Sequence, residues 1–226
     1  MQRKRSLAAF TLMEAMIVVA IIGVMASIGG MKMSDWLGQT HAKAGIRNLA
    51  DLMMLARAEA IRTGDNHIVL FDLDAADGAL TDTSGQPAAS LLIRDADEDG
   101  IVDSGEKVAA VSVPPSGLLS WGSTFAAATS TQAPDDNIDA DFPNADPDFV
   151  CCTFTKPDDS DARWVVFQPD GIPRSFSISP FTAGDAMSGS GAVYVTSGSR
   201  DYAVVLSALG AVRVHTWNSG SSAWTQ

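Results

Sequence analysis

The most apolar run of the chain lies near its start, where FTLMEAMIVVAIIGVMASIGG contains one charged residue, Glu14. Three basic residues, Arg3-Lys4-Arg5, precede it, and the next charge is Lys32. As a helix, Ala15 to Met31 would be about 26 Å long, close to the hydrocarbon thickness of a bilayer. An ionised side chain buried in such a segment costs a few kcal/mol unless it finds a partner. The pattern predicts a membrane-spanning helix in which Glu14 needs a partner.

Beyond this run the helix is predicted to continue as an amphipathic one. Apolar residues recur at spacings of three and four, which places them on one face of a helix: Ile46, Leu49, Met53, Ala56 and Ala60. Gly64, followed by Asp65 and Asn66, is typical of a helix end. We therefore expect the helix to end near Thr63 and to pack on the rest of the chain.

Short apolar or alternating runs separated by turn residues follow the helix. They predict strands at 67–73, 89–94, 107–113, 163–168, 172–178, 191–197, 201–207 and 210–216. Turns at Asp170-Gly171 and at Gly210 would close two hairpins, so the sheet should be antiparallel. The predicted fold class is α+β, with a long N-terminal helix packed on an antiparallel sheet.

The composition shifts to Ala, Thr, Pro and Asp between Gly122 and Asp161, with few apolar clusters. This segment is predicted to be a long exposed loop. Residues 74–88 and 179–190 are predicted to be shorter loops.

Two interpretations of the N-terminus compete. An ordinary secretory signal would be cut after Val24-Met25-Ala26 and would leave Ser27 first. A glutamate so early in the apolar region fits such a signal poorly, since insertion depends on uninterrupted hydrophobicity. The string from Ala9 to Glu14, AFTLME, instead resembles the prepilin peptidase site of type IV pilins, although Ala9 stands where that family usually has Gly.

The resemblance implies cleavage between Ala9 and Phe10 by prepilin peptidase and methylation of the new Phe10 amine. It implies that Glu14 pairs with the amine of a neighbouring pilin subunit and so directs filament assembly. The expected organisation is a leader at 1–9, a transmembrane and assembly half of the helix at 10–35, and a periplasmic domain at 36–226. The protein would sit in the inner membrane as a single-pass protein until it enters a pilus or pseudopilus.

A second stretch narrows the resemblance. NLADLMMLARAEAIRTGDNHIVLF looks like the helix-to-strand passage of the GspH/FimT group of minor pseudopilins and minor pilins, in which an element like Ala56-Arg57-Ala58-Glu59-Ala60 precedes a turn and the first strand. This implies a structural subunit that helps to initiate or assemble a type IV pilus or a type II secretion pseudopilus. Without the N-terminal motif, the same pattern would fit many small α+β domains.

DADEDGIVDSGE has the spacing of a calcium loop. Its oxygen ligands would come from positions 1, 3, 5, 7, 9 and 12, with Gly100 at the sixth: Asp95, Asp97, Asp99, the Ile101 carbonyl, Asp103 and Glu106. The flanking segments are predicted to be strands, so a structural calcium ion would close a hairpin. The alternative is an acidic turn that binds no ion tightly.

The two cysteines, Cys151 and Cys152, are adjacent. Three states stay open, namely a vicinal disulfide, two buried thiols, or pairing with another chain. A Cys-Cys order lacks the spacing of redox enzymes.

Charge and motifs exclude several function classes. The net charge is −12, and losing the leader would make it −15, which disfavours nucleic acid as a partner. No nucleophile elbow, phosphate loop or zinc-protease motif occurs, so we expect no enzyme. A binding module displayed on a filament, either an adhesin or a DNA-uptake receptor, is the alternative function.

Overall fold

The structure is a computed structural model that describes residues 12–71, 88–99, 105–111, 119–126, 151–178, 181–197 and 200–226, without the side chains of 26–38. The chain divides into two compact units, Met1–His41 and Ala42–Gln226. The boundary falls within helix α1, Leu12–Thr63. Each unit is described by itself.

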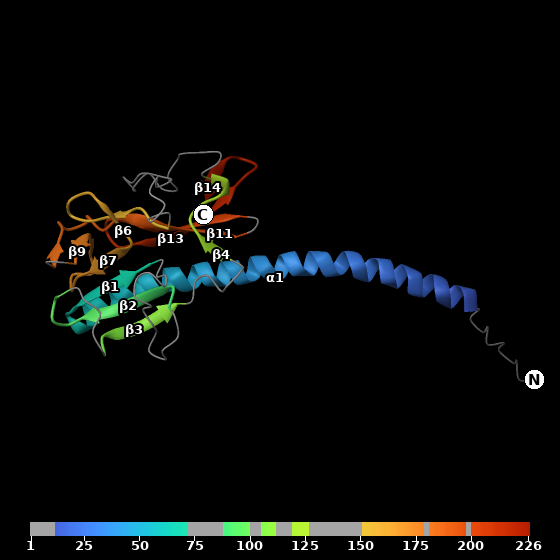
Figure 1. The fold of residues 1–226 in the computed structure, drawn as a ribbon, viewed down its shortest axis with the longest axis horizontal. Coiled ribbons are helices and arrows are strands. Elements are labelled where there is room, and N and C mark those ends of the chain that lie inside the picture. Colours follow the sequence, from blue (N-terminus) through green and yellow to red (C-terminus); the bar gives the residue numbers. More distant parts are fainter. Residues whose placement is uncertain are drawn as a thin grey trace, which may run out of the picture. The chain divides into compact units, whose positions relative to one another are not determined.

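The first unit contains the N-terminal part of α1 (Figure 1). Its large apolar side chains are exposed from Leu12 to Met25, with relative exposures between 46% and 79%. The apolar pattern of this half of the helix predicts that it spans a membrane. Among the helical residues that the structure describes, no stretch is both long and apolar enough to cross one.

The helix ends at Thr63, as predicted. Gly64 has a φ of +78°, and its N–H donates to the Ala60 carbonyl oxygen at 3.0 Å. A left-handed residue just past the last turn is a common way to end a helix, and glycine adopts that conformation without a Cβ penalty.

One five-stranded sheet forms around the strand that follows the helix. Its order is β3-β2-β1-β7-β8, and all of its pairs are antiparallel. The strands are β1 (Asn66–Leu70), β2 (Ser90–Asp95), β3 (Lys107–Val111), β7 (Trp164–Phe167) and β8 (Pro173–Arg174). The prediction of antiparallel pairing is confirmed here.

A second five-stranded sheet contains most of the C-terminal residues, in the order β14-β13-β12-β11-β4. Its strands are β4 (Leu119–Trp121), β11 (Gly191–Ser197), β12 (Asp201–Leu206), β13 (Val212–Asn218) and β14 (Ala223–Thr225). Two small antiparallel pairs complete the described strands: β5 (Phe154–Thr155) with β6 (Asp161–Ala162), and β9 (Phe176–Ser177) with β10 (Thr182–Ala183).

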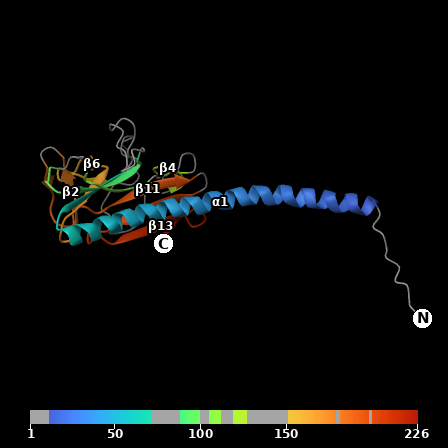
Figure 2. The same cartoon turned by 90° about the horizontal axis from the view of Figure 1, so that it is seen from below.

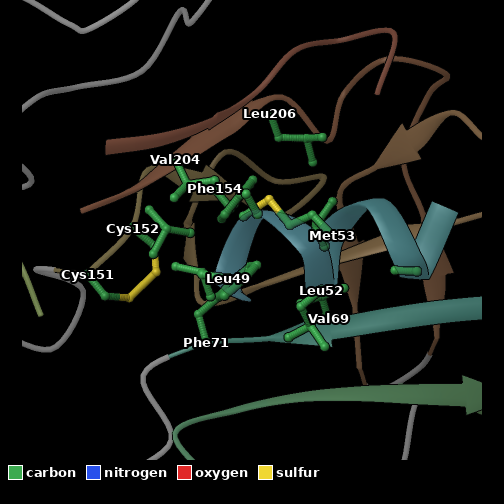
Figure 3. Close-up of a cluster of buried hydrophobic side chains, with 14 of the residues drawn as sticks. Leu49, Leu52, Met53, Val69, Phe71, Cys151, Cys152, Phe154, Val204 and Leu206 are labelled. Atoms are coloured by element: carbon green, nitrogen blue, oxygen red, sulfur yellow. A yellow bond between two sulfur atoms is a disulfide. The ribbon is translucent and has the colours of Figure 1, made fainter. Parts of the chain in front are cut away.

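The main core lies between α1 and both sheets. In two views at right angles, the part of α1 that follows Ala42 runs beside strands of each sheet (Figures 1 and 2). Figure 3 shows Leu49 and Met53 between Phe71 on one side and Val204 and Leu206 on the other. The predicted apolar stripe of the helix is fully buried: Ile46, Leu49, Met53, Ala56 and Ala60 are each at most 1% exposed. Burial of one such large side chain contributes roughly 1.5–3 kcal/mol.

Two strand predictions need correction. The predicted strand 172–178 is two short strands, β8 and β9, separated by Ser175. Five strands were not predicted, namely β4, β5, β6, β10 and β14, and β10 lies in the predicted loop 179–190; each is two or three residues long, too short for a clear alternation of polar and apolar positions.

The prediction of an exposed loop at 122–161 is wrong at both of its described ends. At the N-terminal end, Ala126 is fully buried in a smaller core cluster. Cys151, Cys152 and Phe154 are at most 1% exposed and belong to the main core. Cys152 forms an isolated antiparallel bridge with Val193 of β11. This segment is buried because it pairs with the second sheet, which composition alone does not reveal. Residues 127–150 of the same predicted loop lie outside the described residues.

Candidate functional site

Glu14 lies in the first turn of the described helix and is exposed. A carboxylate there interacts favourably with the positive end of the helix dipole. The side chains around it, such as Met13, Met16 and Ile17, are apolar and more than half exposed. The other two residues of the predicted processing site, Ala9 and Phe10, lie outside the described residues.

The acidic loop joins β2 to β3, which pair antiparallel as a hairpin, as the flanking segments predict. It brings together Asp95, Asp97 and Asp99, whose carboxylate oxygens lie within 4.8 Å of one another. Asp95 is fully buried as the last residue of β2, Asp97 is exposed and Asp99 is half-buried. Three carboxylates so close repel one another, and a hard cation would relieve that repulsion. This cluster could therefore hold a metal ion.

Hydrogen bonds shape both ends of the loop. The Asp99 N–H donates to Asp95 Oδ1 at 3.1 Å, which curls the chain back toward the first ligand position. At the far end, the Glu106 carbonyl oxygen accepts from the Arg94 N–H at 2.8 Å, and Glu106 Oε1 accepts from the Ala96 N–H at 3.3 Å. The predicted twelfth position thus turns back to the start of the loop. Ile101 and Asp103 lie outside the described residues.

An ion pair ties the base of this hairpin to the end of α1. Arg94 Nε donates to Asp65 Oδ2 at 2.7 Å, and Arg94 Nη2 lies 2.6 Å from the same oxygen. Asp65 directly follows the glycine that ends the helix. Because both side chains are partly exposed, the pair contributes little energy but orients the hairpin.

The two cysteines form a vicinal disulfide, with Cys151 Sγ and Cys152 Sγ joined at 2.08 Å. Figure 3 shows the pair at the edge of the cluster that contains Leu49 and Phe154. Among the three states left open by the sequence, the structure has the vicinal bond.

Over 99 residues the chain is 34% identical to the type IV major fimbrial protein FimA of Dichelobacter nodosus. The chain is type IV pilin-like. The match covers 39% of this chain and 59% of FimA, so the chain spans less than two thirds of that relative. No family model and no solved structure matches the chain.

Arg57 connects α1 to a turn of the second sheet, a contact that the sequence did not predict. Its Nη1 donates to the Gly210 carbonyl oxygen at 2.9 Å, in the turn between β12 and β13. A Cβ built on Gly171, in the turn between β7 and β8, would lie 3.4 Å from Arg57 Nε and 2.7 Å from Ile61 Cδ1. Both glycines have positive φ, at +73° and +78°. One arginine of α1 thus sits where two hairpin turns, one from each sheet, come together.

Asp201 is a second residue that sequence reasoning missed. It is fully buried at the start of β12, and its Oδ2 accepts four hydrogen bonds between 2.6 and 3.0 Å. The donors are the Ser123 hydroxyl and the N–H groups of Thr124, Phe125 and Ala126. These donors compensate for burying the carboxylate and fix the segment 123–126 on the sheet. Ser123 lies two residues after β4. The sequence around it does not indicate that it binds a residue 78 positions away.

His67 is buried in β1 of the pilin-like chain. Burial lowers the pKa of its imidazole, and the hydrogen bond between Nδ1 and the Asp65 carbonyl oxygen at 3.1 Å opposes that shift. A neutral His67 is therefore favoured in the folded protein at neutral pH.

Proposed function

We propose that this chain is a minor pilin or pseudopilin, a structural subunit that helps to initiate or assemble a type IV pilus or a type II secretion pseudopilus. The observation that carries the proposal is the contrast along α1. The residues from Leu12 to Met25 expose large apolar side chains around one carboxylate, whereas the apolar stripe from Ile46 to Ala60 is buried in a folded domain. Exposed apolar surface of that extent needs a covering partner. The partial identity to a fimbrial protein supports other pilin subunits as that partner.

Glu14 is the proposed assembly residue. Cleavage before Phe10 would create an amine four residues before Glu14, which is about one helical turn away. The same carboxylate could then pair with the amine of a neighbouring subunit, where the surrounding apolar side chains exclude water and strengthen the attraction. This pairing would set the axial register between neighbouring helices.

Before assembly, we propose that the apolar segment holds the chain in the inner membrane. Arg3, Lys4 and Arg5 would keep the leader in the cytoplasm, because basic residues flanking an apolar segment favour that side. The domain after the helix would then lie in the periplasm. Prepilin peptidase would remove residues 1–9.

We propose a minor pilin or pseudopilin, and not a major pilin, because of the sequence at the end of α1 and in the first strand. The segment around Ala56-Arg57-Ala58-Glu59-Ala60 resembles the GspH/FimT group, and Arg57 in this element contacts a turn of the second sheet. The named relative is a major fimbrial protein, so gene neighbourhood and copy number per filament would test this part of the proposal.

Calcium is the cation that we propose for the acidic loop. The loop offers a set of carboxylate oxygens at the spacing of a calcium loop, and oxygen-only ligands favour calcium or magnesium over zinc. The ion would join the two strands of the β2–β3 hairpin and serve a structural role.

The mature N-terminus tests the family of this protein most directly. Mass spectrometry of the chain recovered from membranes should find a methylated Phe10 as its first residue. A chain that begins at Ser27 would instead identify an ordinary secretory signal and would reject the proposal.

Assembly is tested by replacing Glu14. Glu14→Ala should reduce incorporation into sheared filaments at least tenfold, because the incoming amine loses its partner. Asp51→Ala is the matched control, since Asp51 is an exposed carboxylate on the second half of the same helix. Equal incorporation of the Glu14→Ala protein and the control would contradict the assembly role.

A further inference from the structure

The second sheet carries a cavity of about 290 Å³ at the end where β12 begins and β13 ends. Seven described residues line it: Phe125, Arg200, Thr216, Trp217, Asn218, Ser219 and Thr225. They come from four places in the chain that strand pairing brings together. Nothing in the proposed assembly role uses this cavity.

The chemistry of the lining is unusual for this chain. None of the described lining residues has a carboxylate side chain, although the chain as a whole has a net charge of −12. Arg200 lines the cavity and supplies a positive charge, and among the described residues its guanidinium forms no ion pair. An arginine in this state is suited to bind a carboxylate through two parallel hydrogen bonds.

Other polar groups of the cavity are also available to a ligand. Asn218 uses its Oδ1 to accept from the Gly220 N–H at 2.9 Å, and its amide NH₂ bonds to no described residue. The hydroxyls of Thr216 and Ser219 likewise make no hydrogen bond within the described part of the chain. Phe125 is partly exposed and adds apolar surface, whereas Trp217 is only 4% exposed and belongs to the core beneath the cavity. A cation, an amide, hydroxyls and an aromatic ring around one cavity are a set that recognises a hydroxylated ring bearing an acid group.

The cavity is also held in shape without a ligand. Thr216 and Thr225 are direct partners in the β13–β14 pairing, and the Thr225 hydroxyl donates to the Thr216 carbonyl oxygen at 3.1 Å. Trp217 packs edge-on against Trp224 of β14, with ring centroids 5.4 Å apart. Phe125 is fixed by the bond from its N–H to Asp201 Oδ2 at 2.6 Å. A preformed site loses less entropy when a ligand binds.

We propose that this cavity binds a sugar acid, with the ligand carboxylate on Arg200, its hydroxyls on Thr216, Asn218 and Ser219, and one ring face against Phe125. A volume of about 290 Å³ suits a single monosaccharide unit, either free or at the end of an acidic glycan. The site is independent of the proposed filament role, so either could fail without the other.

The experiment compares glucuronate with glucose, which differ only at the carboxylate. Binding to the full chain in detergent micelles is measured by ligand-detected NMR and by tryptophan fluorescence. Glucuronate should bind at least about tenfold more tightly than glucose, since a hydrogen-bonded ion pair is lost with the neutral sugar. Equal affinities for the two sugars, or no binding of glucuronate at about 20 mM, would overturn the proposal.

Two variants locate the site. Arg200→Gln should weaken glucuronate binding about tenfold or more and leave glucose binding unchanged, whereas Arg47→Gln, at an exposed position on α1, should change neither. Thr216→Val should weaken both sugars alike. Unchanged glucuronate affinity in Arg200→Gln, or unchanged affinity for both sugars in Thr216→Val, would show that any binding occurs elsewhere and would reject the site.

Discussion

The two halves of α1 use apolar residues in opposite ways. Between Leu12 and Met25, exposed apolar residues occupy all sides of the helix, and Leu12 is 79% exposed. After Ala42, one stripe of apolar residues is buried, and Leu49 and Met53 in it are fully buried against two sheets. A stripe finds its cover within the same chain, whereas an all-round apolar helix has more surface than one domain can cover. The buried stripe thus serves folding, and the exposed first half is the part for which we propose a role in association.

Truncating one apolar side chain in each half should test this division most strongly. Met53→Ala should lower the free energy of unfolding by about 2–5 kcal/mol, because it opens a cavity in the core. Val19→Ala, at a position 68% exposed, should leave it within about 0.5 kcal/mol. Chemical denaturation followed by circular dichroism measures both. A similar loss in the two variants would mean that the halves unfold as one unit.

Calcium should stabilise only the half that folds. If the acidic loop binds the ion, calcium at about 100 times its Kd would add about 2.7 kcal/mol to the free energy of unfolding. Asp97→Asn should remove most of this gain and have little effect in a chelator, as measured by thermal unfolding. Asp158→Asn, at an exposed aspartate in a different turn, is the control. Equal losses with and without calcium would reject the metal site.

Arg57 should matter more than its neighbours on the same helix. Arg57→Met removes the donor to the Gly210 carbonyl and should cost about 1–3 kcal/mol of unfolding free energy. Arg62→Met removes an exposed arginine paired with Glu59 and should cost less than about 1 kcal/mol. Urea denaturation measures the loss of unfolding free energy in both variants. Equal losses would show that the bond from Arg57 to the turn does not stabilise the fold.

The smallest expected effect concerns pH. Because burial lowers the pKa of His67 in the folded state, the unfolded chain binds the proton more readily. The free energy of unfolding therefore keeps its full His67 contribution above the ordinary histidine pKa of about 6.5. It loses that contribution as the pH falls below this value, because protons then favour the unfolded chain. His67→Gln should flatten the pH dependence of the unfolding midpoint between about pH 5 and 7. An unchanged slope would assign the dependence to other groups.

Much of the fold follows from sequence periodicity. The stripe from Ile46 to Ala60 predicted the buried face, and Gly64 predicted the helix end within a residue. The spacing of Asp95, Asp97 and Asp99 predicted that their carboxylates would come together. These features are local, since a helix face, a helix end and a loop each depend on a few neighbouring residues.

Features that depend on distant pairing could not be predicted in this way. The segment around Cys151 reads as part of a polar loop but is buried by its pairing with β11. Asp201 reads as a surface aspartate at a strand end, yet it binds a segment that begins 78 residues earlier. The division into two sheets likewise depends on which strands pair and not on any one strand's composition.

The bond between Cys151 and Cys152 closes a ring within two adjacent residues, so it joins no distant segments. A cross-link stabilises a fold mainly by shortening the unfolded chain's loops, and here there is no loop to shorten. Its contribution is instead local: it stiffens one dipeptide and presents a compact, apolar sulfur surface to the interior. A reductant would therefore leave the connectivity of the domain intact and would change only the local packing around these two residues.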